Sequence, residues 1–172
     1  MASGSPFYDR WMTTVSVRPV GPDDHDFVGV TLTASWGTTT VAAHGVRYDA
    51  ATLSGLVAEV DGEPAGLLTY HVDGDEWEVV TINALAHGRG AGTALLRAIE
   101  TAALEAGARR LWLITTNDNT RALKFYQRRG FDLAAFHRDA VTRSRATLKP
   151  SIRLEVDGIA VRHELELERV LR

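Results

Sequence analysis

The chain contains no cysteine among its 172 residues. This absence excludes disulfide bonds, thiolate metal sites and a covalent acyl-cysteine intermediate. It is also compatible with the reducing environment of the cytoplasm, because cytoplasmic proteins rarely carry disulfides. We therefore expect a cytoplasmic protein, and no metal ion is expected as a cofactor.

Long runs of one residue type are absent as well. No apolar stretch approaches the roughly 20 residues of a membrane span, and the N-terminus lacks the apolar core of a signal peptide. The formal net charge is -3, and no long basic run is present, which argues against nucleic acid as the main partner. With 45% hydrophobic and 24% charged residues, the composition is typical of a small enzyme. We expect a single domain over residues 1–172, with a loose start over residues 1–14.

The most informative segment that is present runs from Thr81 to Arg97. A predicted strand leads into His87-Gly88-Arg89-Gly90-Ala91-Gly92, and a predicted helix follows at once. Closely spaced glycines let the backbone adopt conformations that a Cβ forbids, and they let a ligand approach the amides. The first turn of the helix adds unpaired N–H groups and the positive end of the helix dipole. Phosphate oxygens are therefore the expected ligands of this loop.

Three phosphate-binding patterns could apply to this loop, and spacing separates them. A Walker A loop ends in Gly-Lys-Ser/Thr, which the chain lacks. A dinucleotide fingerprint would need a third glycine at Thr93 or at Leu95, so both registers fail. The remaining pattern is Gln/Arg-x-x-Gly-x-Gly/Ala, with His87 at its first position.

A second motif lies downstream, between Asn117 and Phe131. It has the form Asn-x-x-Ala-x-x-Phe-Tyr-x-x-x-Gly-Phe, and it begins at Asn119. This motif and the glycine-rich loop resemble the two signatures of the GNAT superfamily of acyl-CoA-dependent N-acetyltransferases, over roughly residues 56 to 137. The residue types at two of these positions also suit a helix, because Asn119 can cap its start and Gly130 can end it.

The resemblance implies a fold, a co-substrate and a set of contacts. The fold would be α/β (α+β), with a central mixed, mostly antiparallel sheet that is flanked by helices and splayed at the acyl-CoA site. Acetyl-CoA would be the co-substrate and an amine the acceptor, while a homodimer is left open. The implied acetyl-CoA contacts are Leu85, His87, Gly88, Arg89, Gly90, Ala91, Gly92, Thr93, Asn119, Ala122, Phe125 and Tyr126.

Periodicity and turn residues predict the order of the elements. Helices are expected from Pro22, over residues 93–106, from about Asn119 and within residues 138–149. Residues 35–52 show no clean period. The family resemblance implies that the last strand pairs with residues 131–136, which makes residues 138–160 an insertion. The glutamates of this strand are interpreted as a solvated face. The predicted strands cover residues 15–18, 56–61, 64–72, 76–85, 111–114, 131–136 and 161–171.

Acyl transfer to an amine needs a base and an acid. An amine with an ordinary pKa of about 10.4 is protonated at pH 7, and freeing it costs roughly 4 to 5 kcal/mol. An acid near the sulfur helps the thiolate to leave, and Tyr126 matches the tyrosine that has this role in the family. The base is either Glu78 or a water held by Asn83 or Thr81. Strict alternation places these last two on the opposite face of the strand from Glu78.

The acceptor pocket is the least defined part of the sequence. By position within the family, residues 35–52 help to form it, so Trp36 and Tyr48 are substrate-binding candidates together with Thr81 and Asn83. Three functions remain open. The first is direct transfer of an acetyl group from acetyl-CoA to a primary amine of a small molecule or peptide in a ternary complex. The others are a non-catalytic acyl-CoA sensor or structural module, and a nucleotide- or phosphate-binding protein outside the family.

Overall fold

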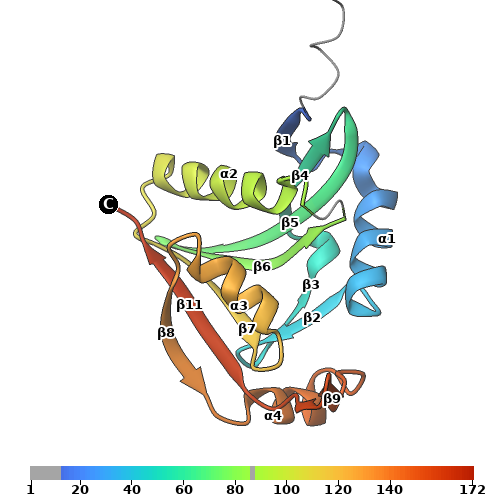
Figure 1. Cartoon of the computed structure of the whole chain (residues 1–172), viewed down its shortest axis with the longest axis vertical. Helices are drawn as coiled ribbons and strands as arrows, with labels where there is room; N and C mark the ends of the chain where they lie inside the picture. The colour runs from blue at the N-terminus through green and yellow to red at the C-terminus, as the bar shows by residue number, and fades with distance from the viewer. Residues whose placement is uncertain (1–12, 86–87) are drawn as a thin grey trace, which may run out of the picture.

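A seven-stranded sheet forms the centre of the computed structural model, which describes residues 13–85 and 88–172 (Figure 1). The strand order is β1-β4-β5-β6-β7-β11-β8. Neighbouring strands are antiparallel except β6 and β7, which are parallel. This architecture confirms the predicted mixed, mostly antiparallel sheet. The strands are β1 (Val15–Pro19), β4 (Ser54–Val60), β5 (Glu63–Asp73), β6 (Glu76–Ala84), β7 (Arg110–Thr116), β8 (Asp132–His137) and β11 (Glu164–Val170).

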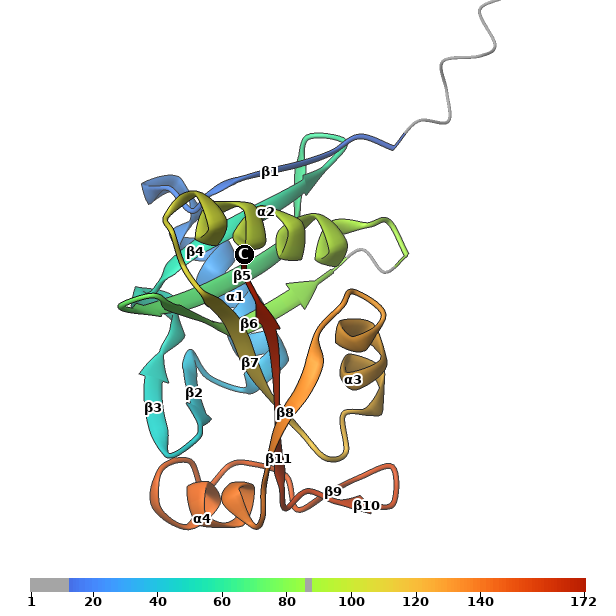
Figure 2. The ribbon, with the colours of Figure 1, turned by 90° about the vertical axis from the view of Figure 1, so that its left-hand side faces the viewer.

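Helices cover both faces of this sheet (Figures 1 and 2). On one face, α2 (Ala91–Glu105) and α3 (Thr120–Gln127) pack over a core that includes Leu95, Ile99 and Leu113. On the other face, α1 (His25–Trp36) packs with Leu67 and Val80. Short 3₁₀ turns, Pro22–Asp24 and Ala50–Thr52, flank this second core. No helix in residues 13–85 or 88–172 is long and apolar enough to cross a membrane.

The strand β6 carries a bulge at Val80. The register between β5 and β6 shifts by one residue there, so Val80 has no partner on β5. An extra residue reverses the alternation of side chains beyond it. Glu78, Thr81 and Asn83 therefore share the face that α1 covers. The expectation that Thr81 and Asn83 point away from Glu78 is wrong, because a period of two holds only along an unbroken strand.

The parallel strands β6 and β7 separate along their length. Their pairing runs from Glu76 with Arg110 to Val79 with Leu113, and no pair follows among the described residues. Both strands nevertheless continue, β6 to Ala84 and β7 to Thr116. Figure 2 shows them diverging. The backbone of each strand beyond the last pair is left without a strand partner on that side, which confirms the predicted splay.

A hairpin that the sequence did not predict covers part of the α1 face. It consists of β2 (Thr40–Ala43) and β3 (Val46–Asp49), joined by a turn at His44 and Gly45. Both turn residues have positive φ, 40° and 81°. This is the two-residue turn whose twist suits antiparallel strands. The unclear period of residues 35–52 therefore reflects short strands, each of four residues.

The last strand joins the sheet between two earlier ones. β11 pairs with β8, as predicted, and also with β7. The segment that precedes it contains α4 (Ala140–Thr147) and a small hairpin of β9 (Glu155–Val156) and β10 (Ile159–Ala160). Figure 1 places this segment at the end of the molecule beside the β2–β3 hairpin. It therefore lies at one end of the gap between β6 and β7.

Candidate active site

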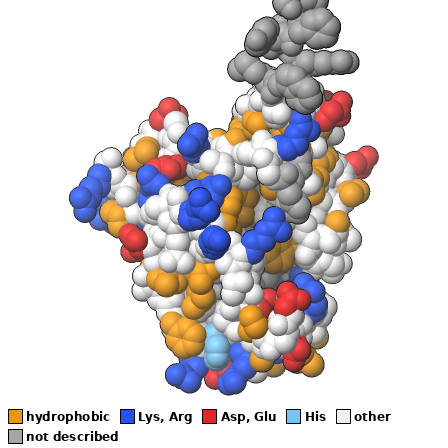
Figure 3. Space-filling view, in the orientation of Figure 1, with side chains coloured by type: hydrophobic (Ala, Val, Ile, Leu, Met, Phe, Trp, Pro, Cys, Tyr) orange, Lys and Arg blue, Asp and Glu red, His pale blue; other side chains and the backbone are white. Residues whose placement is uncertain are grey.

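A cleft of about 1260 Å³ opens where β6 and β7 separate. Its walls come from β6, β7, the start of α2 and one side of α3, and its far end from α1, β2 and residues 149–161. Figure 3 shows Lys and Arg side chains gathered on this face of the molecule. Cations outnumber acids in the lining, although the whole chain is acidic. The charged lining residues are Arg121, Arg129, Lys149 and Arg153 against Asp118 and Glu164.

The glycine-rich loop forms one end of the cleft. Gly88 and Gly90 have φ values of 77° and 88°, a backbone region that glycine enters without strain. Gly90 precedes the first turn of α2 and has no side chain to cap it. The first N–H groups of a helix lack intrahelical acceptors, and here they line the cleft at Ala91, Gly92 and Thr93. These amides are suited to bind a phosphate group.

Arg129 adds a positive charge beside this loop, and it was not predicted from the sequence as a site residue. Its guanidinium donates to Thr93 Oγ1 at 2.5 and 3.1 Å and to the carbonyl of Phe125 at 2.9 Å. The same group stacks 3.7 Å above the centre of the Phe125 ring. Burial lowers the pKa of Arg129 from its ordinary value, yet the side chain stays charged at neutral pH. Its place in the second motif is a variable one, so no pattern singled it out.

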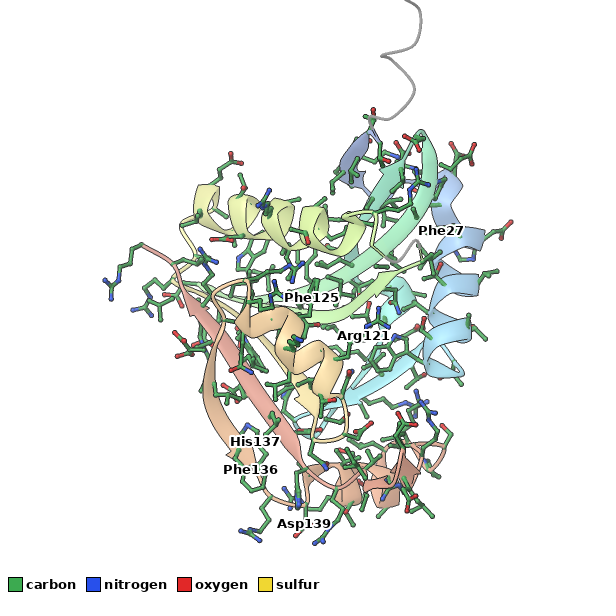
Figure 4. All side chains as sticks on the ribbon, in the orientation of Figure 1. Phe27, Arg121, Phe125, Phe136, His137 and Asp139 are labelled. Atoms are coloured by element: carbon green, nitrogen blue, oxygen red, sulfur yellow. The ribbon has the colours of Figure 1, made fainter. Side chains whose placement is uncertain are left out.

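The helix α3 presents the second motif to the cleft. Asn119 caps it, with its side chain accepting from the Ala122 N–H at 3.1 Å. Figure 4 labels Phe125 and Arg121 on this helix, and both line the cleft. A Cβ on Gly92 would lie 3.2 Å from the Phe125 ring. The glycine therefore permits close packing of α2 on α3 as well as access to the amides.

Tyr126 is largely buried, with 7% of its surface exposed, and it also lines the cleft. Its ring packs against Phe125 and Phe131. Among the described residues, no group hydrogen-bonds its hydroxyl. Burial raises the pKa of this phenol above its ordinary value, so it remains protonated at neutral pH. A neutral phenol facing a cleft can donate a proton.

Glu78 lies beneath the β2–β3 hairpin. Its carboxylate accepts from the Tyr48 hydroxyl at 2.8 Å and contacts His44 Nε2 at 3.0 and 3.1 Å. Only 2% of its surface is exposed, and it is not part of the cleft lining. The hydrogen bond to Glu78 raises the pKa of His44 above its ordinary value. These contacts tie the hairpin to β6.

Glu164 is a cleft residue that was interpreted as part of a solvated strand face. It is 2% exposed and lines the cleft from the start of β11. Its Oε2 accepts from the backbone N–H of His44 at 3.0 Å. Burial raises its pKa above the ordinary value. The alternation of Glu and Leu placed this residue on the correct face of β11, but it did not show that a hairpin covers that face.

Lys149 closes the far end of the cleft. Its ammonium group donates to the carbonyls of Trp36, at 2.9 Å, and Thr40, at 2.7 Å. It thereby joins the segment after α4 to the end of α1 and the start of β2. Burial lowers the pKa of Lys149 from its ordinary value. No pattern around this residue marked it in the sequence.

The structure brings most of the predicted site residues together. Arg89 is an exception, because its guanidinium forms an ion pair with Asp61 and lies outside the lining. Tyr48 and Glu78 also lie outside the cleft lining. His87 and most of residues 1–14 fall outside the described residues. The predicted residues that line the cleft are Trp36, Thr81, Asn83, Leu85, Gly88, Gly90, Ala91, Gly92, Thr93, Asn119, Ala122, Phe125 and Tyr126.

Comparison with known proteins agrees with this geometry. The model of the family described as "Acetyltransferase (GNAT) family" matches residues 25–131. The uncharacterized protein YdhI of Bacillus subtilis (strain 168) is 38% identical over 138 residues, which is 79% of this chain and 86% of that protein. An IAA acetyltransferase from Bacillus cereus ATCC 14579 has a similar structure, with a TM-score of 0.68 and 19% identity over 92% of this chain and 100% of that one.

A GNAT family acetyltransferase from Elizabethkingia anophelis, solved with acetyl-CoA bound, has a TM-score of 0.67 and 17% identity, covering 91% of this chain and 98% of that one. The chain therefore belongs to the GNAT family of acetyltransferases. The resemblance noted from its two motifs is confirmed.

Proposed function

We propose that this protein transfers an acetyl group from acetyl-CoA to a primary amine by direct attack in a ternary complex. One observation carries the proposal: the gap between β6 and β7 and the amides of the glycine-rich loop open into the same cleft. The loop would hold the pyrophosphate, and the gap would hold the arm that ends in the thioester. The likeness to a relative solved with acetyl-CoA supports this arrangement.

The polar lining fits such a ligand. Asn83 Oδ1 and Asp118 Oδ1 are buried and have no hydrogen-bond donor among the described residues. Both residues line the cleft. Buried oxygens of this kind need a donor, and the amide groups of the pantetheine arm can supply N–H donors. Arg121 and Arg129 provide positive charge for the phosphates.

Tyr126 is the proposed acid of the reaction. The amine nitrogen forms a bond to the acetyl carbonyl carbon and loses one proton to a base, and the bond from that carbon to sulfur breaks. The thiolate that leaves takes the phenolic proton of Tyr126, whose hydroxyl is free of other partners among the described residues. The absence of cysteine excludes a covalent acyl-cysteine step, which favours direct transfer between the two substrates.

Steady-state kinetics with a panel of primary amines tests the proposal, with release of CoA as the readout. Initial-rate lines that intersect when both substrates are varied would agree with a ternary complex. Parallel lines, or an acetylated protein in the mass spectrum, would contradict direct transfer. Tight binding of acetyl-CoA without turnover of any amine would instead support the non-catalytic acyl-CoA module.

A further inference from the structure

Glu164 brings a buried carboxylate to the acceptor end of the cleft. It begins β11 and pairs with Thr116 at the end of β7, beyond the point where β7 has left β6. Its side chain lies on the face of the sheet that the β2–β3 hairpin covers. The carboxylate therefore lies at the cleft wall and away from the loop that would bind phosphate.

One backbone amide holds this carboxylate in place. Oε2 accepts from His44 N–H at 3.0 Å, whereas Oε1 has no donor among the described residues. His44 is itself fixed, because it has a φ of 40° in the hairpin turn and its ring packs at a tilt of 59° against that of Trp112, with the centroids 5.1 Å apart. The ring is also bound to Glu78. The amide is thus aimed at Glu164 by a rigid turn, and one oxygen remains available.

In the described part of the chain, the charge of Glu164 is matched only at longer range, by His44, His137 and Arg143. Among the described residues, no cationic nitrogen lies within 4.0 Å of its oxygens. Its neighbours along β11 differ, because Glu166 binds Arg110 and His137, and Glu168 binds Arg110. A buried carboxylate without a cation is costly. An ammonium group from a ligand would supply the missing charge.

Apolar side chains line the far end of the cleft, together with Lys149, Ser151 and Arg153. The same end of the cleft is lined by aliphatic side chains and by Trp36, and Lys149 is occupied by two carbonyls. An amine that enters here would place its charged end on Glu164 and its stem against this apolar wall. The aliphatic lining residues are Val41, Ala43, Ile114, Val141, Ile152 and Val161.

We propose that Glu164 binds the ammonium group of the acceptor and takes its proton, and that the acceptor is a primary amine on an apolar stem. This assignment rests on the proposed acetyl transfer. An N–H bond of the ammonium breaks and an O–H bond forms at Oε1. The freed lone pair forms the bond to the acetyl carbon, the bond from that carbon to sulfur breaks, and the departing thiolate takes the proton of Tyr126. The nitrogen of the new amide then gives its second proton to the Tyr126 phenolate, which restores the phenol. Glu164 rather than Glu78 is then the base.

Binding of a probe amine tests the site without any reaction. With CoA present and no acetyl donor, calorimetry compares phenethylamine with 2-phenylethanol, which has the same stem and no charge. The parent protein should bind the amine at least ~10-fold more tightly, the factor that corresponds to about 1.4 kcal/mol. Equal affinities for the two probes would overturn the proposal, and this comparison requires no variant.

A matched pair of variants assigns the preference to Glu164. Glu164→Gln removes the charge but retains an oxygen for the His44 N–H, so it should lose the preference for the amine. Glu168→Gln, on the same face of the same strand and outside the cleft lining, should retain it. If Glu164→Gln still prefers the amine, Glu164 is not the ammonium site.

Turnover separates this inference from the proposed function. With acetyl-CoA and phenethylamine, Glu164→Gln should lower kcat/KM for the amine by roughly 10²- to 10⁴-fold and leave the KM for acetyl-CoA unchanged. A variant as active as the parent would overturn the role of Glu164 while acetyl transfer stands. A parent that binds the amine selectively but acetylates no amine would overturn acetyl transfer and leave the ammonium site intact.

Discussion

Replacing Tyr126 by phenylalanine removes one oxygen atom from the cleft wall and leaves the ring. The ring makes the packing contacts with Phe125 and Phe131, at centroid distances of 5.3 and 5.9 Å. No described residue bonds to the hydroxyl, so its removal orphans no partner and avoids the usual penalty of about 1–3 kcal/mol. The free energy of unfolding and the affinity for acetyl-CoA should therefore change little.

The rate of the chemical step should fall sharply in the same variant. Loss of one general acid typically lowers a rate by roughly 10²- to 10⁴-fold, which corresponds to about 2.7 to 5.4 kcal/mol in the activation free energy. A single-turnover measurement with enzyme in excess isolates this step from product release. Tyr70→Phe is a suitable control, because Tyr70 stacks on Trp77 and lies outside the cleft lining.

Two results would refute the argument for Tyr126. If Tyr126→Phe reacts as fast as the parent when the chemical step limits the rate, the thiolate takes its proton from elsewhere. If the variant loses its affinity for acetyl-CoA together with its activity, the hydroxyl supports binding rather than catalysis. A loss of rate with unchanged affinity, set against an unaltered Tyr70→Phe protein, is the expected outcome.

Three further predictions concern the loop, the far end of the cleft and the hairpin. Gly90→Ala forces alanine toward a φ of 88° and should weaken acetyl-CoA binding about 10-fold, as measured by calorimetry. The control Gly74→Ala, at a φ of 59° in the β5–β6 turn, should leave this affinity unchanged. Lys149→Met leaves two carbonyls without a donor and should lower the free energy of unfolding in urea by roughly 1–3 kcal/mol. The same substitution at the exposed Lys124 should leave the free energy of unfolding nearly unchanged. The raised pKa of His44 stabilises the fold fully below its ordinary value of 6.5 and loses this effect as pH rises through the folded pKa. The advantage of the parent over His44→Asn in thermal unfolding should shrink above pH 6.5, and a constant difference would contradict this.

Local signals in the sequence were sufficient for much of the fold. Asn119 was predicted to cap α3 from its own chemistry, and its side chain does so. Gly130, with a φ of 82°, follows α3 as expected. Both features depend on residues that are close in the chain. The pairing of the last strand with residues 131–136 is also found in the structure, but it was implied by the family resemblance and not by the local pattern.

The features that were missed depend on contacts between distant residues or on a break in a period. The turn at His44 and Gly45 lacks the usual Asn-Gly pair, so the sequence did not clearly predict a hairpin there. The bulge at Val80 reversed the face of Thr81 relative to Glu78. Glu164 is covered by a residue 120 positions away in the chain. A pattern of neighbouring residues cannot predict a contact across that separation.

Glu78 and Glu164 differ in their partners, and this difference favours Glu164 as the base. Both carboxylates are 2% exposed, and the same hairpin covers both. Glu78 receives a hydroxyl and an imidazole from His44 and Tyr48, so its charge is matched inside the protein. Glu164 receives one backbone amide and keeps an oxygen at the cleft. A carboxylate whose partners are internal stabilises the fold, whereas one that lacks a cation gains most from a cationic ligand. The hairpin therefore fixes β6 through Glu78, and the open oxygen of Glu164 supports our proposal that this carboxylate binds the acceptor.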